Sequence, residues 1–218
     1  MILLASHLFA MSMLWSEATT RSYDLSSTKG LKVIGGTLAT AEYKGRKSVL
    51  LTQTGMTDGI AIVGAQDFKN GTIDFDIAGM PIKGTTPDVR GFVGIAFRIS
   101  PDNTKFEIFY LRETNGRSDD QERRNHAVQY CSPPAYSWKR LRGEKPFRYE
   151  AYTDLEVGAW THVHIEVQGT EAQFYVGRAS QPCLVVHDLL LGETHGKIGL
   201  WVGDQSQAYY ANLRVVQS

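Results

Sequence analysis

The chain has 218 residues, 42% of them hydrophobic, and its 23 lysines and arginines balance 23 aspartates and glutamates. This length and composition suit one large domain with a sizeable core. A neutral chain has no general electrostatic attraction to nucleic acid or to an anionic membrane, so we expect neither as a partner.

The first 18 residues differ from everything after them. Residues 2–15 are almost wholly apolar, and Ser16, Glu17 and Ala18 have the small-x-small pattern found before a cleavage point. This predicts a signal peptide at 1–18 and a secreted or periplasmic protein, although the extreme N-terminus has no Lys or Arg. The run is too short for a normal membrane span. The alternatives are a wrongly assigned start or a short helix packed on the domain; residues 19–218 are expected to form one domain.

Short runs of alternating apolar and polar residues follow, separated by Gly, Asn, Asp and Pro. Strands are predicted near residues 21–25, 31–34, 37–43, 48–52, 60–63, 71–78, 92–99, 105–113, 126–131, 147–153, 161–168, 172–177, 183–187, 197–202 and 208–216. No long helical periodicity appears. Many short strands with turn signals and no helices indicate an all-β sandwich or barrel.

The alternation also predicts which side of a strand is buried. Residues 161–168 alternate valine and isoleucine with histidine, glutamate and glutamine, and residues 71–78 alternate isoleucine and phenylalanine with aspartate. Such strands are half-buried, as in a two-layer sandwich.

Residues 92–99 and 105–113 are predicted to pair as a hairpin around a Pro-Asp-Asn turn. In one register, the core face holds Val93, Ile95, Phe97, Phe109 and Leu111. The opposite face then places small residues beside Arg98, Tyr110 and Arg112, which suits the floor of a ligand groove. A shift of one residue instead puts Arg98 across from Glu107, with which it would pair. The sequence leaves both registers open.

Residues 106–154 are the richest part of the chain in arginine and aromatic side chains. Guanidinium groups donate paired hydrogen bonds, and aromatic rings offer rigid stacking surfaces. The predicted ligand-binding residues are Arg98, Tyr110, Arg112, Arg117, Arg124, Asn125, His126, Gln129, Trp138 and Tyr152. The alternative is a solvated loop whose charges pair with one another and contribute little.

Five segments occur in a characteristic order, namely GFVGIAFR, FEIFYLR, WTHVHIEVQGTEAQFYV, GKIGLWVG and AYYANLRV. Together they resemble the concanavalin A-like lectin/glucanase superfamily, which includes laminin G-like domains. More narrowly, they resemble bacterial 3-keto-disaccharide hydrolase and family-16-glucanase-like domains. The resemblance implies a jelly-roll β-sandwich of two antiparallel sheets whose concave face often binds carbohydrate.

The catalytic signature of family-16 glucanases does not carry over. Asp74 and Asp76 share a strand face, but Ala78 stands where a third carboxylate is needed. Retaining glycosidases need two closely placed carboxyl groups, so a solvated strand face is the favoured interpretation.

Three functions remain. The first is an exported carbohydrate-binding domain. The second is an enzyme acting on 3-keto-glycosides, which would need a base and groups that stabilise an enolate. Its candidate catalytic residues are Glu107, Asp120, His126 and Glu150. The third is a laminin G-like protein-interaction module.

No cofactor or metal site is predicted. His162, His164 and Glu166 lie on one strand face, where they could bind zinc, but polar alternation alone gives this pattern on a solvent face. Structural calcium is frequent among the proteins that the chain resembles, but no acidic loop here supplies enough ligands. Cys131 and Cys183 are interpreted as unpaired structural thiols, with a disulfide as the alternative.

Overall fold

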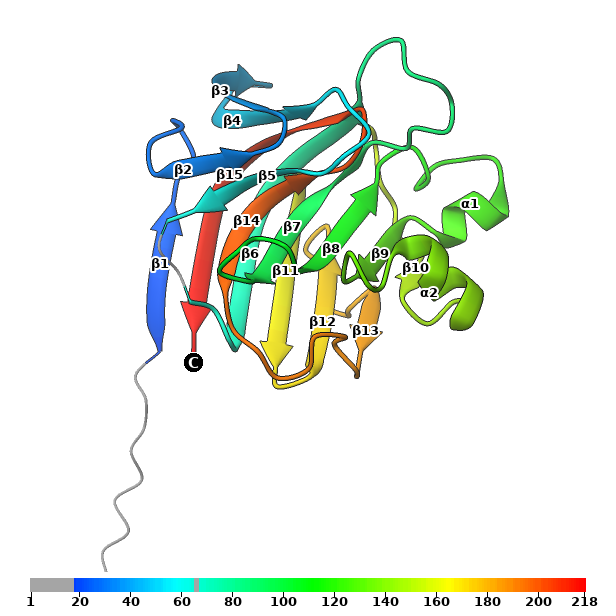
Figure 1. Cartoon of the computed structure of the whole chain (residues 1–218). Coiled ribbons are helices and arrows are strands. Elements are labelled where there is room, and N and C mark those ends of the chain that lie inside the picture. Colours follow the sequence, from blue (N-terminus) through cyan, green and yellow to red (C-terminus); the bar gives the residue numbers. More distant parts are fainter. Residues whose placement is uncertain (1–17, 65–66) are drawn as a thin grey trace, which may run out of the picture.

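The alternating strands of the sequence form two antiparallel β-sheets packed face to face (Figure 1). In this computed structural model, the described residues are 18–64 and 67–218. The first sheet contains, in spatial order, β13 (Leu184–Val186), β12 (Glu171–Val176), β11 (Thr161–Gln168), β6 (Gly71–Pro81), β15 (Ser206–Gln217), β4 (Arg46–Gln53) and β3 (Thr37–Tyr43), with β1 (Thr19–Tyr23) also paired to β15. The second contains β10 (Glu150–Ala151), β9 (Val128–Cys131), β8 (Glu107–Arg112), β7 (Phe92–Ile99), β14 (Lys197–Val202), β5 (Gly59–Val63) and β2 (Leu31–Ile34). The predicted all-β sandwich of two antiparallel sheets is confirmed.

The core lies between the two sheets, where the apolar halves of the strands meet. Ile73 and Ile77 of β6 are fully buried, and so is Ile165 of β11. Phe109 of the second sheet stacks on Phe174 of the first, with ring centroids 4.2 Å apart. Each fully buried side chain of this size contributes roughly 1.5–3 kcal/mol, so this layer provides the main stabilisation of the sandwich.

The predicted hairpin forms in the first of the two registers. Val93 lies opposite Leu111, and Ile95 lies opposite Phe109. Tyr110 and Arg112 therefore point to the outer face of the second sheet, as expected from the alternation.

Arg98 departs from that alternation because β7 contains a bulge. Between its pairs with Lys197 and Gly199 of β14, the strand has one extra residue, and Arg98 adopts a φ of 51°. A bulge re-aims the side chain that it contains. The guanidinium turns into the sandwich and donates to the carbonyl oxygens of Lys69 and Gly169, each at 2.7 Å.

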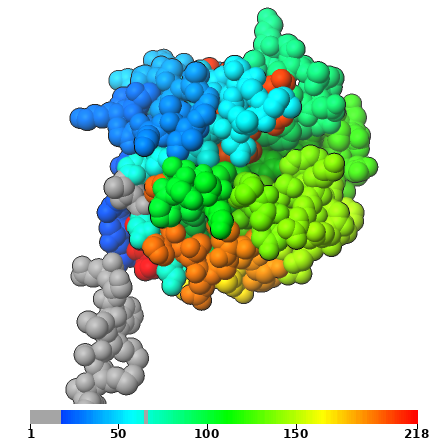
Figure 2. Space-filling view, viewed as in Figure 1, coloured from blue at the N-terminus to red at the C-terminus, as the bar shows by residue number. Residues whose placement is uncertain are grey.

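The two connections that flank β9, one from β8 and one to β10, each contain a short helix, which the sequence did not predict. These are α1 (Gln121–Asn125) and α2 (Trp138–Glu144). Asp120 and Ser137 cap them by accepting backbone N–H groups of their first turns. The strand predicted at 147–153 is reduced to the two residues of β10. In Figure 1 both helices lie beside β9 and β10, and in Figure 2 this segment is the yellow-green shoulder at the right.

The outer face of the first sheet carries His162 and His164. Each pairs across the strands with an aspartate: Nδ1 of His162 is 2.9 Å from Asp76, and Nδ1 of His164 is 2.6 Å from Asp74. Within residues 18–64 and 67–218, no group of three or more His, Cys, Asp or Glu side chains is arranged to hold a metal ion. These histidines therefore serve as partners of the aspartates in this structure.

Three further expectations concern the ends and the thiols. Cys131 is buried, Cys183 is half-buried, and neither forms a disulfide. In the part of the chain that is described, no helix is long and apolar enough to cross a membrane. The predicted signal peptide, 1–18, lies outside the described residues except for Ala18.

Candidate functional site

A cleft of about 470 Å³ opens at the end of β8, between the loop before β7 and the two helices. We call it the Arg112 cleft. Its lining residues are Asp88, Arg90, Phe92, Arg112, Asn115, Asp120, Glu122, Arg123, His126, Trp138 and Arg142. The cleft therefore combines four arginines with two aromatic rings and a histidine.

A row of side chains across the second sheet supports the cleft. Strand pairing places Glu150 opposite Gln129, Gln129 opposite Tyr110, and Tyr110 opposite Gly94. These residues share one face because paired positions in antiparallel strands point the same way. The floor of the site is thus built on the rigid sheet, whereas its walls come from the helical segment.

Arg112 is held by four partners on this face. Its Nη1 donates to Glu150 Oε1 at 2.8 Å and to the carbonyl of His126 at 3.0 Å. Its Nη2 donates to the hydroxyl of Tyr110 at 2.9 Å and to Oε1 of Gln129. The guanidinium is almost fully enclosed, and charge-assisted bonds of this kind are about twice as strong as neutral ones. Arg112 is therefore fixed in one orientation.

Glu150 is shared by two guanidinium groups. Besides Arg112, it accepts hydrogen bonds from Arg142 of α2, one of them from Nε at 3.1 Å. Burial raises the pKa of Glu150, but the hydrogen bonds and charges of Arg142 and Arg112 outweigh it, and the net pKa is lowered. The carboxylate is ionised and tied down, which makes it a weak base and a good anchor.

His126 stands against the same carboxylate. Its Nδ1 lies 3.0 Å from Oε2 of Glu150, but the two are not aligned for a hydrogen bond. Burial lowers the pKa of His126, and the charges of Arg142 and Arg112 add to this effect against the opposing pull of Glu150. The imidazole is therefore neutral at neutral pH and can act as a hydrogen-bonding or stacking group.

Exposed aromatic rings surround the cleft. Trp138 is 47% exposed, and the guanidinium of Arg142 lies 5.1 Å from its ring centroid. Phe147 is 72% exposed and lies parallel to the imidazole of His126 at 6.4 Å. Exposed rings held in place by neighbouring groups provide flat apolar surface for a ligand.

Several enclosed polar atoms here have no hydrogen-bond partner among the residues that the structure describes. They are Oδ1 of Asn115, Nε of Arg123 and Nε2 of Gln129. The first two belong to lining residues. An enclosed polar atom without a partner costs about 1–3 kcal/mol, so a ligand that offers both donors and acceptors, as hydroxyl groups do, would offset this cost.

Apart from Arg98, the predicted ligand-binding residues divide into three groups. Arg112, His126 and Trp138 line the cleft, and Tyr110 and Gln129 lie directly beneath it. Arg124 and Tyr152 are not lining residues, and Arg124 donates to the hydroxyl of Tyr152 at 2.9 Å. Asn125 accepts a hydrogen bond within α1, and exposed Arg117 pairs with Asp154 and Glu156.

Arg98 was expected on the groove floor, and this placement is wrong. It is 1% exposed and lies inside the sandwich, where Nη1 is 3.5 Å from Glu107. The pairing with Glu107 does occur, but the bulge causes it rather than the shifted register that the sequence allowed.

The four candidate catalytic residues do not all lie together in the structure. Glu107 is fully buried between the sheets and accepts a hydrogen bond from Tyr130 at 2.8 Å, so it does not reach the cleft. Asp120 lines the cleft but also caps α1. His126 and Glu150 are in contact. Only two of the four therefore meet.

Sequence reasoning missed Arg90, Phe92, Asn115, Arg123 and Arg142 as site residues. Arg142 lies one helical turn after Trp138, and this i, i+4 spacing after a capping serine was the available signal. Arg90 and Asn115 come from the two chain segments flanking the hairpin, and no local pattern indicates that they converge.

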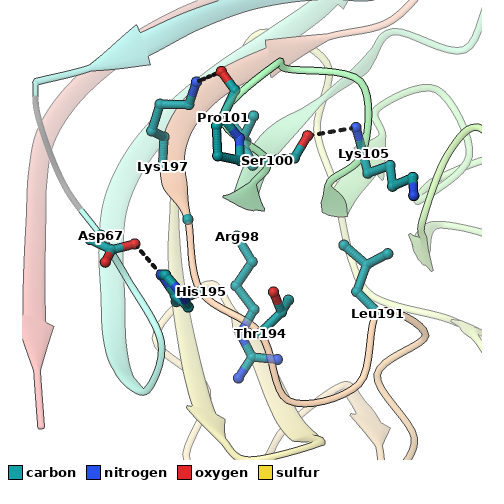
Figure 3. Close-up of a pocket in the computed structure, with 11 residues that line it drawn as sticks. Asp67, Arg98, Ser100, Pro101, Lys105, Leu191, Thr194, His195 and Lys197 are labelled. Atoms are coloured by element: carbon teal, nitrogen blue, oxygen red, sulfur yellow. Dashed lines mark hydrogen bonds and ion pairs between the residues drawn. The ribbon is translucent and has the colours of Figure 1, made fainter.

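A second cavity, of about 810 Å³, lies between the turn at 100–105 and the loop at 191–197 (Figure 3). Two of its polar groups are already paired: Lys197 donates to the carbonyl of Pro101 at 3.0 Å, and His195 lies 2.6 Å from Asp67. In Figure 3, Arg98 runs toward Thr194 and away from the turn. Among the described residues, no enclosed side-chain polar atom that lines this larger cavity lacks a partner, whereas the Arg112 cleft has such atoms, and we take the Arg112 cleft as the candidate site.

Comparison with solved structures gives relatives in fold. The carbohydrate binding module CBM66 from Bacillus subtilis matches with a TM-score of 0.61 and 17% identity, over 85% of this chain and 95% of that one. A Bacillus subtilis protein of unknown function with a galectin-like fold matches with 0.59 and 15% identity, over 90% and 94%. The carbohydrate recognition domain of Emp47p matches with 0.58 and 10%, over 90% and 95%.

These likenesses establish that the chain has a concanavalin A-like jelly-roll fold, as the sequence resemblance implied. No protein-family model matches the sequence, and no curated protein matches it significantly. The narrower resemblance to 3-keto-disaccharide hydrolases stays a prediction.

Proposed function

We propose that the protein binds carbohydrate and that the sugar lies in the Arg112 cleft. The observation that carries this proposal is that the unpartnered polar atoms of Asn115 and Arg123 belong to residues that line the same cleft as the exposed ring of Trp138. Sugars present hydroxyl groups around an apolar ring face, and such a cleft matches both features. Two proteins of the same fold are named for carbohydrate binding or recognition, which adds support.

The fixed groups of the cleft favour binding over catalysis. Glu150 is held by two arginines and has a lowered pKa, so it would be a poor general base. Glu107 is enclosed in the core. A hydrolase acting on 3-keto-glycosides therefore has less support, and incubation with such a glycoside tests it directly: turnover would establish an enzyme.

Binding is tested on an array of plant, algal and bacterial glycans, followed by calorimetry on each hit. Trp138→Ala should weaken a true hit by about tenfold because the stacking surface is lost. Tyr175→Ala is the matched control, since this half-buried ring lies on β12 of the other sheet and its hydroxyl donates to Gln173. Absence of any glycan ligand, or equal loss in both variants, would contradict the proposal.

Export belongs to the same proposal, with residues 1–18 as its leader. Expression of the full chain in a secreting host, followed by N-terminal sequencing, should give a mature protein beginning at residue 19. A product that retains Met1 in the cell would contradict export without bearing on sugar binding.

A further inference from the structure

The inner layer of the Arg112 cleft contains more positive than negative charge. Arg112 and Arg142 share the single carboxylate of Glu150. Arg90 and Arg123 add two further half-buried guanidinium groups. The other acidic lining residues, Asp88, Asp120 and Glu122, are all exposed at the rim. Exposed carboxylates are screened by water and salt, so they neutralise the inner layer only weakly.

Arg123 is the guanidinium that has no carboxylate partner. Its side chain makes no ion pair among the described residues, and its Nε is enclosed without a hydrogen-bond partner. The neighbouring Arg90 donates from Nη1 to the carbonyl oxygen of Pro87, and its ion pair is loose, since Nη2 is 3.4 Å from an Asp88 carboxylate that is 94% exposed. Two cationic side chains thus face the cleft with bonding capacity left over.

The arginines also act on one another. Burial lowers the pKa of Arg90, and the positive charges of Arg123 and Arg112 lower it further. A lowered pKa of this origin means that like charges are held together at some cost in free energy. An anionic group placed between them would remove that cost.

From this arrangement we infer that the sugar bound in the Arg112 cleft is acidic, with a carboxylate or sulfate group held by Arg123 and Arg90. Both groups present paired oxygen atoms that match the planar donors of a guanidinium. The inference rests on the proposed carbohydrate function and names the class of sugar for the same site. Trp138 would then contact the ring of the sugar, while Arg123 and Arg90 hold its charge.

Matched pairs of ligands test the role of charge. Oligosaccharides of galacturonic, glucuronic and mannuronic acid are each compared with their carboxyl-reduced counterparts, and a sulfated galactan fragment with its desulfated form. Calorimetry should show at least one acidic member binding roughly tenfold or more tighter than its neutral partner, with affinity falling as salt rises. Preference for a uronate or for the sulfated fragment identifies which anion the site takes.

Two substitutions with opposite expected effects on the affinity for acidic sugars make the test specific. Arg123→Gln should remove the preference for the acidic member, because it should lower the affinity for the acidic member about tenfold more than the affinity for its neutral partner. Glu122→Gln removes a carboxylate from the rim and should strengthen acidic binding. Arg117→Gln is the control, because this arginine pairs with Asp154 and Glu156 outside the cleft, and it should change neither affinity. Unchanged thermal unfolding of all three variants establishes that they are folded.

The outcomes separate the two claims. If neutral sugars bind in a Trp138-dependent manner and their acidic partners bind no better, the acidic preference is wrong and carbohydrate binding stands. Equal weakening of acidic and neutral ligands by Arg123→Gln would also overturn the preference, since it would show a role in shaping the cleft rather than in holding charge. If no sugar binds at all, both claims fail.

Discussion

Glu150→Gln is the sharpest test of how the cleft is built. The substitution keeps the shape of the side chain and removes its charge, which leaves Arg112 buried beside neutral partners. Breaking a buried ion pair by removing one charge costs about 3–5 kcal/mol. Because glutamine still offers one acceptor oxygen and Arg142 is 36% exposed, we expect the lower end, about 3 kcal/mol.

In a domain of this size, each 1 kcal/mol shifts the melting temperature by about 2–4 °C, so the variant should melt roughly 6–12 °C lower. Urea unfolding followed by tryptophan fluorescence gives the free energy of unfolding directly. The control is Glu144→Gln, which removes one partner of an exposed pair with Arg140 within α2 and should cost less than about 1 kcal/mol. Equal losses in the two variants would refute the idea that Arg112 depends on a buried counter-charge.

The contribution of Glu150 to the stability of the fold depends on pH, because folding changes the pKa of this carboxyl group. The folded state lowers this pKa below the reference value of 4.5, so the unfolded chain takes up a proton first as the solution is acidified. The stability that Glu150 contributes is therefore complete well above pH 4.5 and is lost as the pH falls through the lower folded value. The difference between the wild type and Glu150→Gln should shrink in that acidic window. If the difference in free energy of unfolding between the two proteins stays constant down to pH 3, the lowered pKa of Glu150 is contradicted.

Three further outcomes are expected. Arg98→Met removes the guanidinium partner of Glu107 inside the sandwich and should lower the free energy of unfolding by about 3–5 kcal/mol, measured by urea unfolding. Burial raises the pKa of Glu113 well above its usual value, so this carboxyl group lowers the stability of the fold as the pH rises. Glu113→Gln should therefore unfold at a higher urea concentration than the wild type at pH 7. A lower unfolding midpoint would contradict this. Burial also raises the pKa of Cys131 to about 12 and that of Cys183 to about 11, so a thiol reagent at neutral pH should label both slowly in the native protein and fast in urea.

The fold followed from the sequence because alternation is a local property. The strand at 92–99 was placed with the residues that the structure gives to β7, and its pairing with β8 follows from matching apolar faces. The bulge at Arg98 was not predictable in this way. In this strand the apolar residues recur at every second position from Val93 to Ile99, so the sequence shows no break, and only the pairing with β14 reveals the extra residue.

The site was predicted in part, and for a different reason. Arg112, His126 and Trp138 were found because they fall in one arginine- and aromatic-rich stretch. The helices in this stretch were not predicted. Helix α2 has only seven residues, and of these only Leu141 is buried, which is too little for a helical period to show in the sequence. Arg90 and Asn115 are 25 positions apart in sequence, and they meet because antiparallel β7 and β8 bring the two segments together.

Glu150 connects the second sheet to helix α2. It is the last side chain of the row across the second sheet, and it receives Arg112 from β8 and Arg142 from α2. The same carboxylate therefore fixes the floor of the cleft and docks the helix that supplies Trp138. Because its charge is used twice within the protein, it cannot also neutralise Arg90 and Arg123. The positive charge left over in the inner layer of the cleft follows from this use of Glu150 as an anchor, and a ligand that brings its own negative charge would complete the arrangement.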